Sequence, residues 1–165
     1  MPILFPTLCL KRVTDITLDL LKDISINTVL LDVDNTLAAP ESMELFDGVL
    51  NWINTLKKAN IKLIVISNNY RKRVEPFANS LDLPFICFAM KPLPFKIRKV
   101  YKGINRKQSE VLLVGDQIFT DILGANLSHI KSVLLEPVIK ESEKITVNLR
   151  RFLEKPIRKK ILKRS

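Results

Sequence analysis

Two aspartates that stand one residue apart are the first candidates for chemistry. Asp32 and Asp34 lie at the end of the apolar, β-branched run 28–33, so on an extended strand their side chains share one face. Two neighbouring carboxylates repel each other unless a cation compensates their charge. Asp116, which follows a later apolar run at 111–114, would complete a set of hard oxygen ligands of the kind that binds Mg²⁺. The three aspartates therefore indicate a magnesium site.

A hydroxyl group and an ammonium group occur at comparable places along the chain. Ser67 follows the apolar run 61–66, and Lys91 comes just past the run 85–88. Beside a magnesium ion, these two side chains would hold the oxygens of a phosphoryl group while it is transferred. The combined set of carboxylates, hydroxyl and lysine predicts phosphoryl-transfer chemistry.

These residues need a fold that brings distant segments to one edge. Short apolar runs alternate with segments of helical spacing, which is typical of a parallel sheet with helices on both faces. The expected fold is a Rossmann-like three-layer α/β/α domain around a five-stranded parallel sheet. In such sheets ligands bind beyond the carboxyl ends of the strands, where the candidate residues lie. The predicted strands are 28–33, 61–66, 85–88, 111–114 and 133–135, and the predicted helices are 17–23, 43–59, 70–82, 94–106 and 120–127.

The candidate residues fall into four motifs, which in chain order are the DxDxT box at 32–36, Ser67-Asn68, Lys91, and Gly115-Asp116 through Asp121. Their order and their places at strand ends resemble the haloacid dehalogenase (HAD) superfamily of phosphatases. Within it, the strings DNTLAAP, ISNN and GDQIFTDILGANL resemble the YqeG-type branch of subclass III, which also contains the mitochondrial phosphatidylglycerophosphate phosphatases. The resemblance covers roughly residues 3–160.

This resemblance implies a two-step reaction. Asp32 would attack phosphorus and form an aspartyl-phosphate. Asp34 would first protonate the leaving oxygen and then activate water for the second step. Ser67 would bind the phosphoryl group, and Lys91 would neutralise its growing charge.

The resemblance also implies the ligands of the metal. Mg²⁺ would bind Asp32, the main-chain carbonyl of Asp34, and Asp116. Asp121 would be a second acidic support, acting through water or through Lys91, although its position also suits the start of a helix.

Three further side chains are candidate substrate ligands. Asn68 follows Ser67 directly, and Arg71 and Arg73 come shortly after it. The two arginines would form a positive rim that attracts an anionic substrate, or they would only begin a solvated helix. Ser67 could cap that helix as well as bind phosphate.

The spacing of the motifs leaves no room for a cap domain. Between Asp34 and Ser67 lie 32 residues, and between Ser67 and Lys91 lie 23; in each case a helix and a strand use most of them. The active site is therefore expected to be open. An open site suits a large or surface-bound substrate better than a small metabolite that needs enclosure.

The charge of the chain is concentrated at its end. The sequence has 27 Lys and Arg against 17 Asp and Glu, which gives a net charge of +10. Residues 140–165 hold ten basic and three acidic residues, so they form a basic tail beside a phosphatase core at 1–139. Net charge bears on the partners of a protein, and here it suggests a polyanion.

The basic tail also carries apolar residues at helical spacing between Ile145 and Leu162, and Pro156 is expected to divide it into two short helices. Such a segment either binds an anionic membrane surface or packs an apolar stripe on the core and leaves a solvated basic face. Nucleic acid is a weaker alternative, because the sequence shows no RNA-binding module or stacking platform.

Together these features predict a Mg²⁺-dependent phosphomonoester hydrolase that acts on phosphatidylglycerophosphate at a membrane surface. The alternatives are a phosphatase of a soluble sugar phosphate, nucleotide or polynucleotide end, and a protein that binds RNA or a ribosome through its tail. Cys9 and Cys87 lack metal-ligand spacing and suit a reducing cytoplasm, and no apolar run is long enough to span a membrane. The expected location is cytoplasmic with peripheral membrane attachment. The sequence gives no indication of the oligomeric state.

Overall fold

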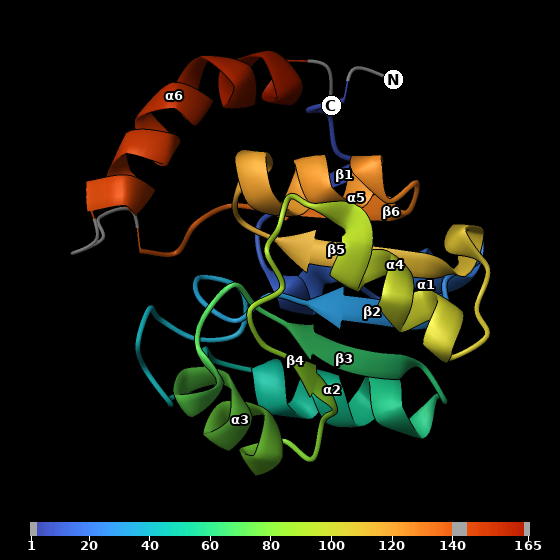
Figure 1. Ribbon diagram of the computed structural model, residues 1–165. Coiled ribbons are helices and arrows are strands. Elements are labelled where there is room, and N and C mark those ends of the chain that lie inside the picture. The colour runs from blue at the N-terminus through green and yellow to red at the C-terminus, as the bar shows by residue number, and fades with distance from the viewer. Residues whose placement is uncertain (1–2, 140–144, 164–165) are drawn as a thin grey trace.

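A parallel sheet of six strands forms the centre of the molecule (Figure 1). The computed structural model describes residues 3–139 and 145–163. The strand order is β1-β6-β5-β2-β3-β4, and every neighbouring pair is parallel. The strands are β1 Leu8–Leu10, β2 Thr28–Leu31, β3 Lys62–Ile66, β4 Phe85–Ile86, β5 Val111–Gly115 and β6 Lys131–Leu135.

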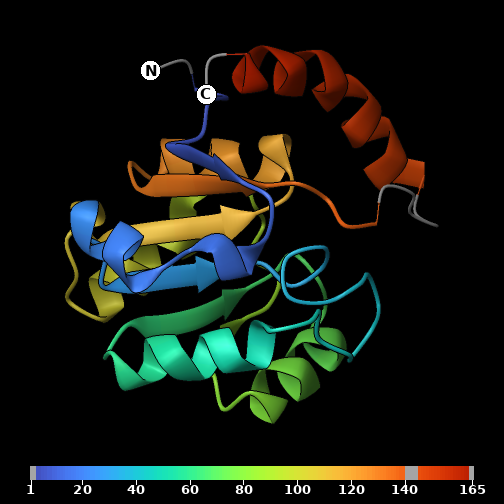
Figure 2. The ribbon, with the colours of Figure 1, turned by 180° about the vertical axis from the view of Figure 1, so that it is seen from behind.

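Helices cover both faces of the sheet, as the sequence predicted (Figure 1, Figure 2). The helices are α1 Leu18–Asp23, α2 Val49–Lys58, α3 Arg71–Ser80, α4 Pro94–Gly103, α5 Leu123–Leu127 and α6 Ile145–Leu162, and a π-helical turn at Ile118–Ile122 precedes α5. The first three pack on the face that carries Val29 and Leu31 of β2, whereas α4 and α5 pack on the face that carries Leu30. A strand covered on both faces must be apolar throughout, which explains the continuous apolar runs.

The first strand and the start of α2 differ from the prediction. The sixth strand, β1, was not predicted; it has three half-buried residues and pairs with β6 at one edge of the sheet. The helix α2 begins at Val49 instead of residue 43. Gly48 precedes it with φ 78°, a backbone conformation that favours glycine, and Leu45 forms an isolated bridge with Ala38 in the loop before it.

The C-terminal helix α6 continues across Pro156, so the prediction of two short helices is wrong. Proline removes one backbone hydrogen bond and bends a helix without having to end it, and Figure 1 shows that α6 is curved. Residues 140–144, where the basic tail begins, lie outside the described residues. Within the described ranges, no helix combines the length and the apolar character that crossing a membrane requires.

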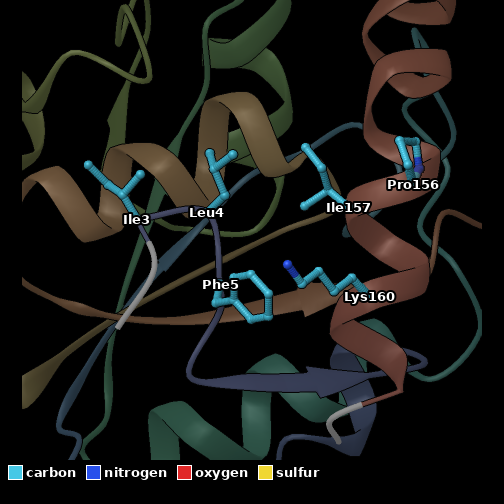
Figure 3. A pocket seen from close by; sticks show the side chains of 6 residues that line it. All are labelled: Ile3, Leu4, Phe5, Pro156, Ile157 and Lys160. Atoms are coloured by element: carbon cyan, nitrogen blue, oxygen red, sulfur yellow. The ribbon is translucent and has the colours of Figure 1, made fainter.

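The later part of α6 lies beside the N-terminal segment of the chain. A groove of about 350 Å³ separates the two, and its six lining residues are drawn in Figure 3. Its walls are mainly apolar, and the side chain of Lys160 extends across it toward Phe5. None of the candidate catalytic residues lines this groove.

Candidate active site

The candidate residues lie at the carboxyl ends of the strands, as expected for a parallel sheet. Asp32 directly follows β2, Ser67 follows β3, and Asp116 follows β5. Lys91 lies in the loop between β4 and α4, and Asp121 lies in the π-helical turn. The structure brings Asp32, Lys91, Asp116 and Asp121 into one buried cluster.

Lys91 connects two of the three buried aspartates. Its Nζ atom donates to Oδ1 of Asp32 at 2.8 Å, to Oδ1 of Asp121 at 2.6 Å and to the carbonyl oxygen of Ile66 at 3.1 Å. Burial alone would lower the pKa of Lys91, but Asp121 and Asp32 outweigh that effect, so its pKa is raised. Lys91 therefore stays a cation beside Asp32 at any physiological pH.

The three buried carboxylates carry more negative charge than Lys91 can neutralise. Oxygen atoms of Asp32, Asp116 and Asp121 all lie within 4.8 Å of one another. Burial, with a further contribution from Asp121, raises the pKa of Asp32 to about 7 although Lys91 opposes the shift. Burial and the charges of Asp121 and Asp32 raise the pKa of Asp116 to about 8. The cluster is therefore short of positive charge.

This cluster fits a divalent cation. Oδ1 of Asp116 is buried and accepts no hydrogen bond in the described part of the chain. A buried carboxylate oxygen without a partner is costly, and a hard cation would satisfy it. Gly115 lets the cluster close, because a Cβ atom at this position would overlap the carboxyl group of Asp121.

Asp34 lies outside this cluster and closer to solvent. Its Oδ2 atom accepts a hydrogen bond from Nδ2 of Asn69 at 2.7 Å, and its Oδ1 atom accepts one from Nη2 of Arg73 at 3.1 Å. The same Arg73 nitrogen also donates to the carbonyl oxygen of Ser42 at 2.6 Å. The side chain of Asp34 is 21% exposed, so it is fixed in place and still accessible.

The other candidate substrate ligands have different surroundings. Ser67 is buried, and its Oγ atom accepts from the backbone N–H of Asn69 at 3.2 Å. Asn68 donates to the backbone carbonyl of Lys91 at 2.9 Å and accepts from its N–H at 2.7 Å, so it supports the lysine loop. Arg71 forms an exposed ion pair with Glu75 at 2.6 Å. That these three side chains bind substrate stays a prediction.

A second cation, which the sequence pattern does not predict, reaches the cluster from α6. Nη2 of Arg151 donates to Oδ2 of Asp116 at 3.2 Å, and its Nη1 atom donates to the carbonyl oxygen of Ile139 at 2.8 Å. Arg158, two turns later, donates to the backbone carbonyls of Asp116 and of Leu135. The end of the chain thus holds both the side chain and the main chain of Asp116.

Between Arg151 and Glu154, the face of α6 toward the core is therefore polar. Glu154 is 2% exposed and accepts from the backbone N–H of Phe119 at 2.8 Å. Only further along do Ile157 and Ile161 pack against apolar residues of the π-helical turn and β6. Residues 151, 154, 158 and 161 recur at helical spacing, and this spacing could have indicated the side of α6 that faces the core. The sequence-based prediction considered a stripe of apolar residues alone.

Comparison with known proteins adds an independent line of evidence. A family model described as mitochondrial PGP phosphatase matches residues 2–140. The chain is 30% identical over 136 residues to "Probable phosphatase YqeG" of Bacillus subtilis, which covers 82% of this chain and 79% of that protein. It is 25% identical over 169 residues to phosphatidylglycerophosphate phosphatase 1 of Arabidopsis thaliana, a chloroplastic and mitochondrial protein, with 97% of this chain and 49% of that protein covered.

Solved structures share the same fold at low sequence identity. A putative haloacid dehalogenase-like hydrolase from Bacteroides fragilis matches with a TM-score of 0.58 and 15% identity, covering 74% of this chain and 93% of that one. The D,D-heptose 1,7-bisphosphate phosphatase of B. bronchiseptica, solved with magnesium and phosphate, matches with a TM-score of 0.54 and 16% identity, covering 67% and 80%. These likenesses concern the fold.

Proposed function

We propose, from the premise that this chain belongs to the mitochondrial PGP phosphatase family and is a phosphatase of the HAD superfamily, that it hydrolyses a phosphomonoester in two steps with Mg²⁺ as cofactor. The substrate we propose is phosphatidylglycerophosphate at a membrane surface. One observation carries the mechanism: Asp32 lies against Lys91 and beside Asp116, whose buried Oδ1 atom has no hydrogen-bond partner among residues 3–139 and 145–163.

In the first step, a carboxylate oxygen of Asp32 attacks phosphorus, and the bond from phosphorus to the ester oxygen breaks. Asp34 gives its proton to that oxygen, so the alcohol leaves neutral. Asn69 and Arg73 hold both oxygens of Asp34 at the accessible side of the cluster, where a leaving group has room. The product of this step is an aspartyl-phosphate on Asp32.

In the second step, Asp34 takes a proton from a water molecule that attacks the same phosphorus. The acyl-phosphate bond breaks, phosphate leaves, and Asp32 is a carboxylate again. Lys91 stays charged throughout and neutralises the oxygens on phosphorus as the transferred group gains negative charge.

A magnesium ion bound by Asp32 and Asp116, with the Asp34 carbonyl as a further ligand, would supply charge stabilisation for the phosphoryl oxygens. Asp121 is already bonded through one oxygen to Lys91 and through the other to the backbone N–H of Gln117. We therefore propose that Asp121 positions Lys91 and does not bind the metal ion directly.

Two observations support a lipid substrate. Between β2 and β3 the chain forms only a loop and α2, and between β3 and β4 it forms only α3, so neither connection holds a cap domain over the site. The net charge of +10 favours attraction to an anionic surface, and peripheral attachment to a membrane is part of the proposal. The name of the Arabidopsis thaliana relative is consistent with this substrate.

The test is phosphate release by the purified full chain from phosphatidylglycerophosphate in mixed micelles, with and without Mg²⁺. A panel of sugar phosphates, nucleotides and a 5′-phosphorylated oligonucleotide is assayed alongside. We expect the lipid to have the highest kcat/KM and the Asp32→Asn variant to lose release from every substrate. Activity on a soluble phosphate with none on the lipid would overturn the substrate, whereas full activity of Asp32→Asn would overturn the mechanism.

A further inference from the structure

Large exposed apolar side chains gather in the segments that follow the carboxyl ends of the strands. We call this set the apolar rim. One arm comes from the start of α3 and from the loop and first turn of α4, and the other comes from the segment after β6 and the first half of α6. The first arm is Tyr70, Phe88, Met90, Leu93 and Phe95, and the second arm is Val138, Ile139, Leu149, Phe152 and Leu153.

The loop that delivers Lys91 also builds the first arm. Phe88 and Met90 are exposed, whereas Ala89 and Lys91 are buried. Successive side chains of this loop therefore point alternately toward solvent and toward the core. Phe88 has φ 48° and Met90 has φ 58°, which bulky residues rarely adopt. The ring of Tyr70 meets the ring of Phe88 edge-on, with 5.0 Å between centroids. These outward side chains are therefore held in place.

The second arm has a fixed orientation because α6 is hydrogen-bonded to the core through its other face. Arg151 binds Asp116 and buried Glu154 binds Phe119, so the opposite face of α6 must point away from the core. That face carries Phe152, which is 65% exposed, and Leu149, which is 58% exposed. Large apolar side chains are seldom left in contact with water as a group unless they serve an interaction.

The two arms flank the edge of the sheet that carries the active site. The arrows of the strands point to this edge, where the first half of α6 lies on one side and the loop before α4 and the start of α3 lie on the other (Figure 1, Figure 2). Asp34, the accessible carboxylate of the site, is at the same edge. A flat partner that touched both arms would face the catalytic cluster.

We propose that the apolar rim docks on an anionic phospholipid bilayer and turns the active site toward the lipid headgroups. This inference rests on the proposed lipid substrate and names the surface that reaches it. Exposed basic residues accompany the rim, with Lys72 beside the first arm and Arg150 and Lys155 beside the second. The ammonium group of Lys155 lies 5.8 Å from the ring centroid of Phe152. Apolar side chains with flanking cations are what an interfacial helix presents to anionic lipid.

This surface differs from the basic tail taken as a whole. Lys159 and Lys160 lie in the last turn of α6, and Lys163 directly follows the helix, all beyond the stretch that carries Leu149, Phe152 and Leu153. Leu162, at that far end, is 51% exposed, the same fraction as Leu153. The two leucines on one helix therefore make a matched pair, one in the rim and one outside it.

The experiment is flotation of the full chain with vesicles of phosphatidylcholine containing phosphatidylglycerol, and with vesicles of phosphatidylcholine alone. We expect binding to the anionic vesicles that falls at least about tenfold in the double variant Phe95→Ser, Leu153→Ser, because each substitution replaces a large apolar side chain that would enter the bilayer with a small polar one. Leu162→Ser should bind like the wild type. All three proteins should hydrolyse a soluble phosphomonoester at the same rate, which shows that they are folded.

Several outcomes would overturn the inference. They are a wild type that does not bind anionic vesicles, a double variant that binds as well as the wild type, and an equal loss in Leu162→Ser. A double variant that changes the oligomeric state instead of vesicle binding would assign the rim to contacts between copies of this chain. Rim-dependent vesicle binding without hydrolysis of the lipid would reject the proposed substrate and leave the docking surface standing.

Discussion

Lys91 and Arg151 reach the same acidic cluster from different elements of the chain, and the two side chains differ in how far they are buried. Lys91 comes from a loop next to the sheet, its side chain is 2% exposed, and it binds both Asp32 and Asp121. Arg151 comes from the last helix, its side chain is 13% exposed, and its ion pair in the cluster is with Asp116. The contrast separates a cation that touches the proposed nucleophile, Asp32, from a cation that holds a proposed metal ligand, Asp116, in position.

Replacing Lys91 should have the largest effect. Lys91→Met leaves Asp32 and Asp121 buried without their shared cation, so we expect a loss of stability of about 3 kcal/mol. It also removes a charged donor from the transition state, and kcat should fall about 10²–10³-fold. Urea unfolding and steady-state kinetics on a soluble phosphomonoester measure the two effects. A variant with normal stability would contradict the compensating role of Lys91.

Replacing Arg151 should have a smaller and different effect. Arg151→Met leaves Asp116 without its guanidinium partner, and we expect the metal-free protein to lose about 1–2 kcal/mol. Because a cation in the cluster would take over that compensation, Mg²⁺ should raise the melting temperature more in the variant than in the wild type. Thermal unfolding with EDTA and with Mg²⁺ measures this. Equal shifts in both proteins would mean that Arg151 does not act on the metal site. The shift in Arg151→Lys should lie between that of the wild type and that of Arg151→Met.

The pH dependence of stability provides a further test of the cluster. The folded pKa values of Asp32 and Asp116, about 7 and about 8, lie above the ordinary value of 3.8. Between about pH 4 and 8, the folded chain therefore binds more protons than the unfolded chain. The stability of the metal-free protein should fall across this window, by at most about 1.4 kcal/mol per pH unit for each group. Urea unfolding in EDTA checks this, and Asp116→Asn should flatten the slope at its alkaline end.

Arg71 should show the smallest effect, because it is exposed and its partner Glu75 lies on the surface. We expect Arg71→Ala to keep its stability and to lose about two- to fivefold in kcat/KM on an anionic substrate, only at low salt. Kinetics at two ionic strengths measure the change. A larger loss that persists at high salt would place Arg71 in direct contact with substrate and would add a third cation to the comparison.

The sequence predicted the parts of the site that local pattern can reveal. Asp32 and Asp116 directly follow strands that are buried on both faces, so continuous apolar runs located them. The apolar run at 85–88 located the loop that carries Lys91, although the strand there, β4, is a half-buried edge strand. Arg151 could not be found this way, because its position depends on how α6 packs. The apolar pattern of that helix left open whether it packs on the core, and the structure divides it: Leu149 and Phe152 point away from the core, whereas Ile157 and Ile161 pack on it.

Long-range pairing also explains why the sequence did not predict β1 or the correct start of α2. β1 has three half-buried residues, and among the described strands it pairs with β6, which is its neighbour in the sheet but lies far along the sequence, at Lys131–Leu135. No local periodicity can develop over three residues, so pairing decides whether they form a strand. The start of α2 was misplaced because Leu45 has helical spacing with the residues after it, yet it pairs with Ala38 in a loop.

The lengths of the edge strands have a consequence for the behaviour of the chain at high concentration. The two strands at the borders of the sheet, β1 and β4, have three and two residues, whereas those between them have four or five. An unpaired strand edge invites another chain to add a strand, and the risk grows with the length of the free edge. The edge strands β1 and β4 are too short to pair with a strand of another chain over any length. Their shortness therefore protects the molecule from aggregation through strand pairing.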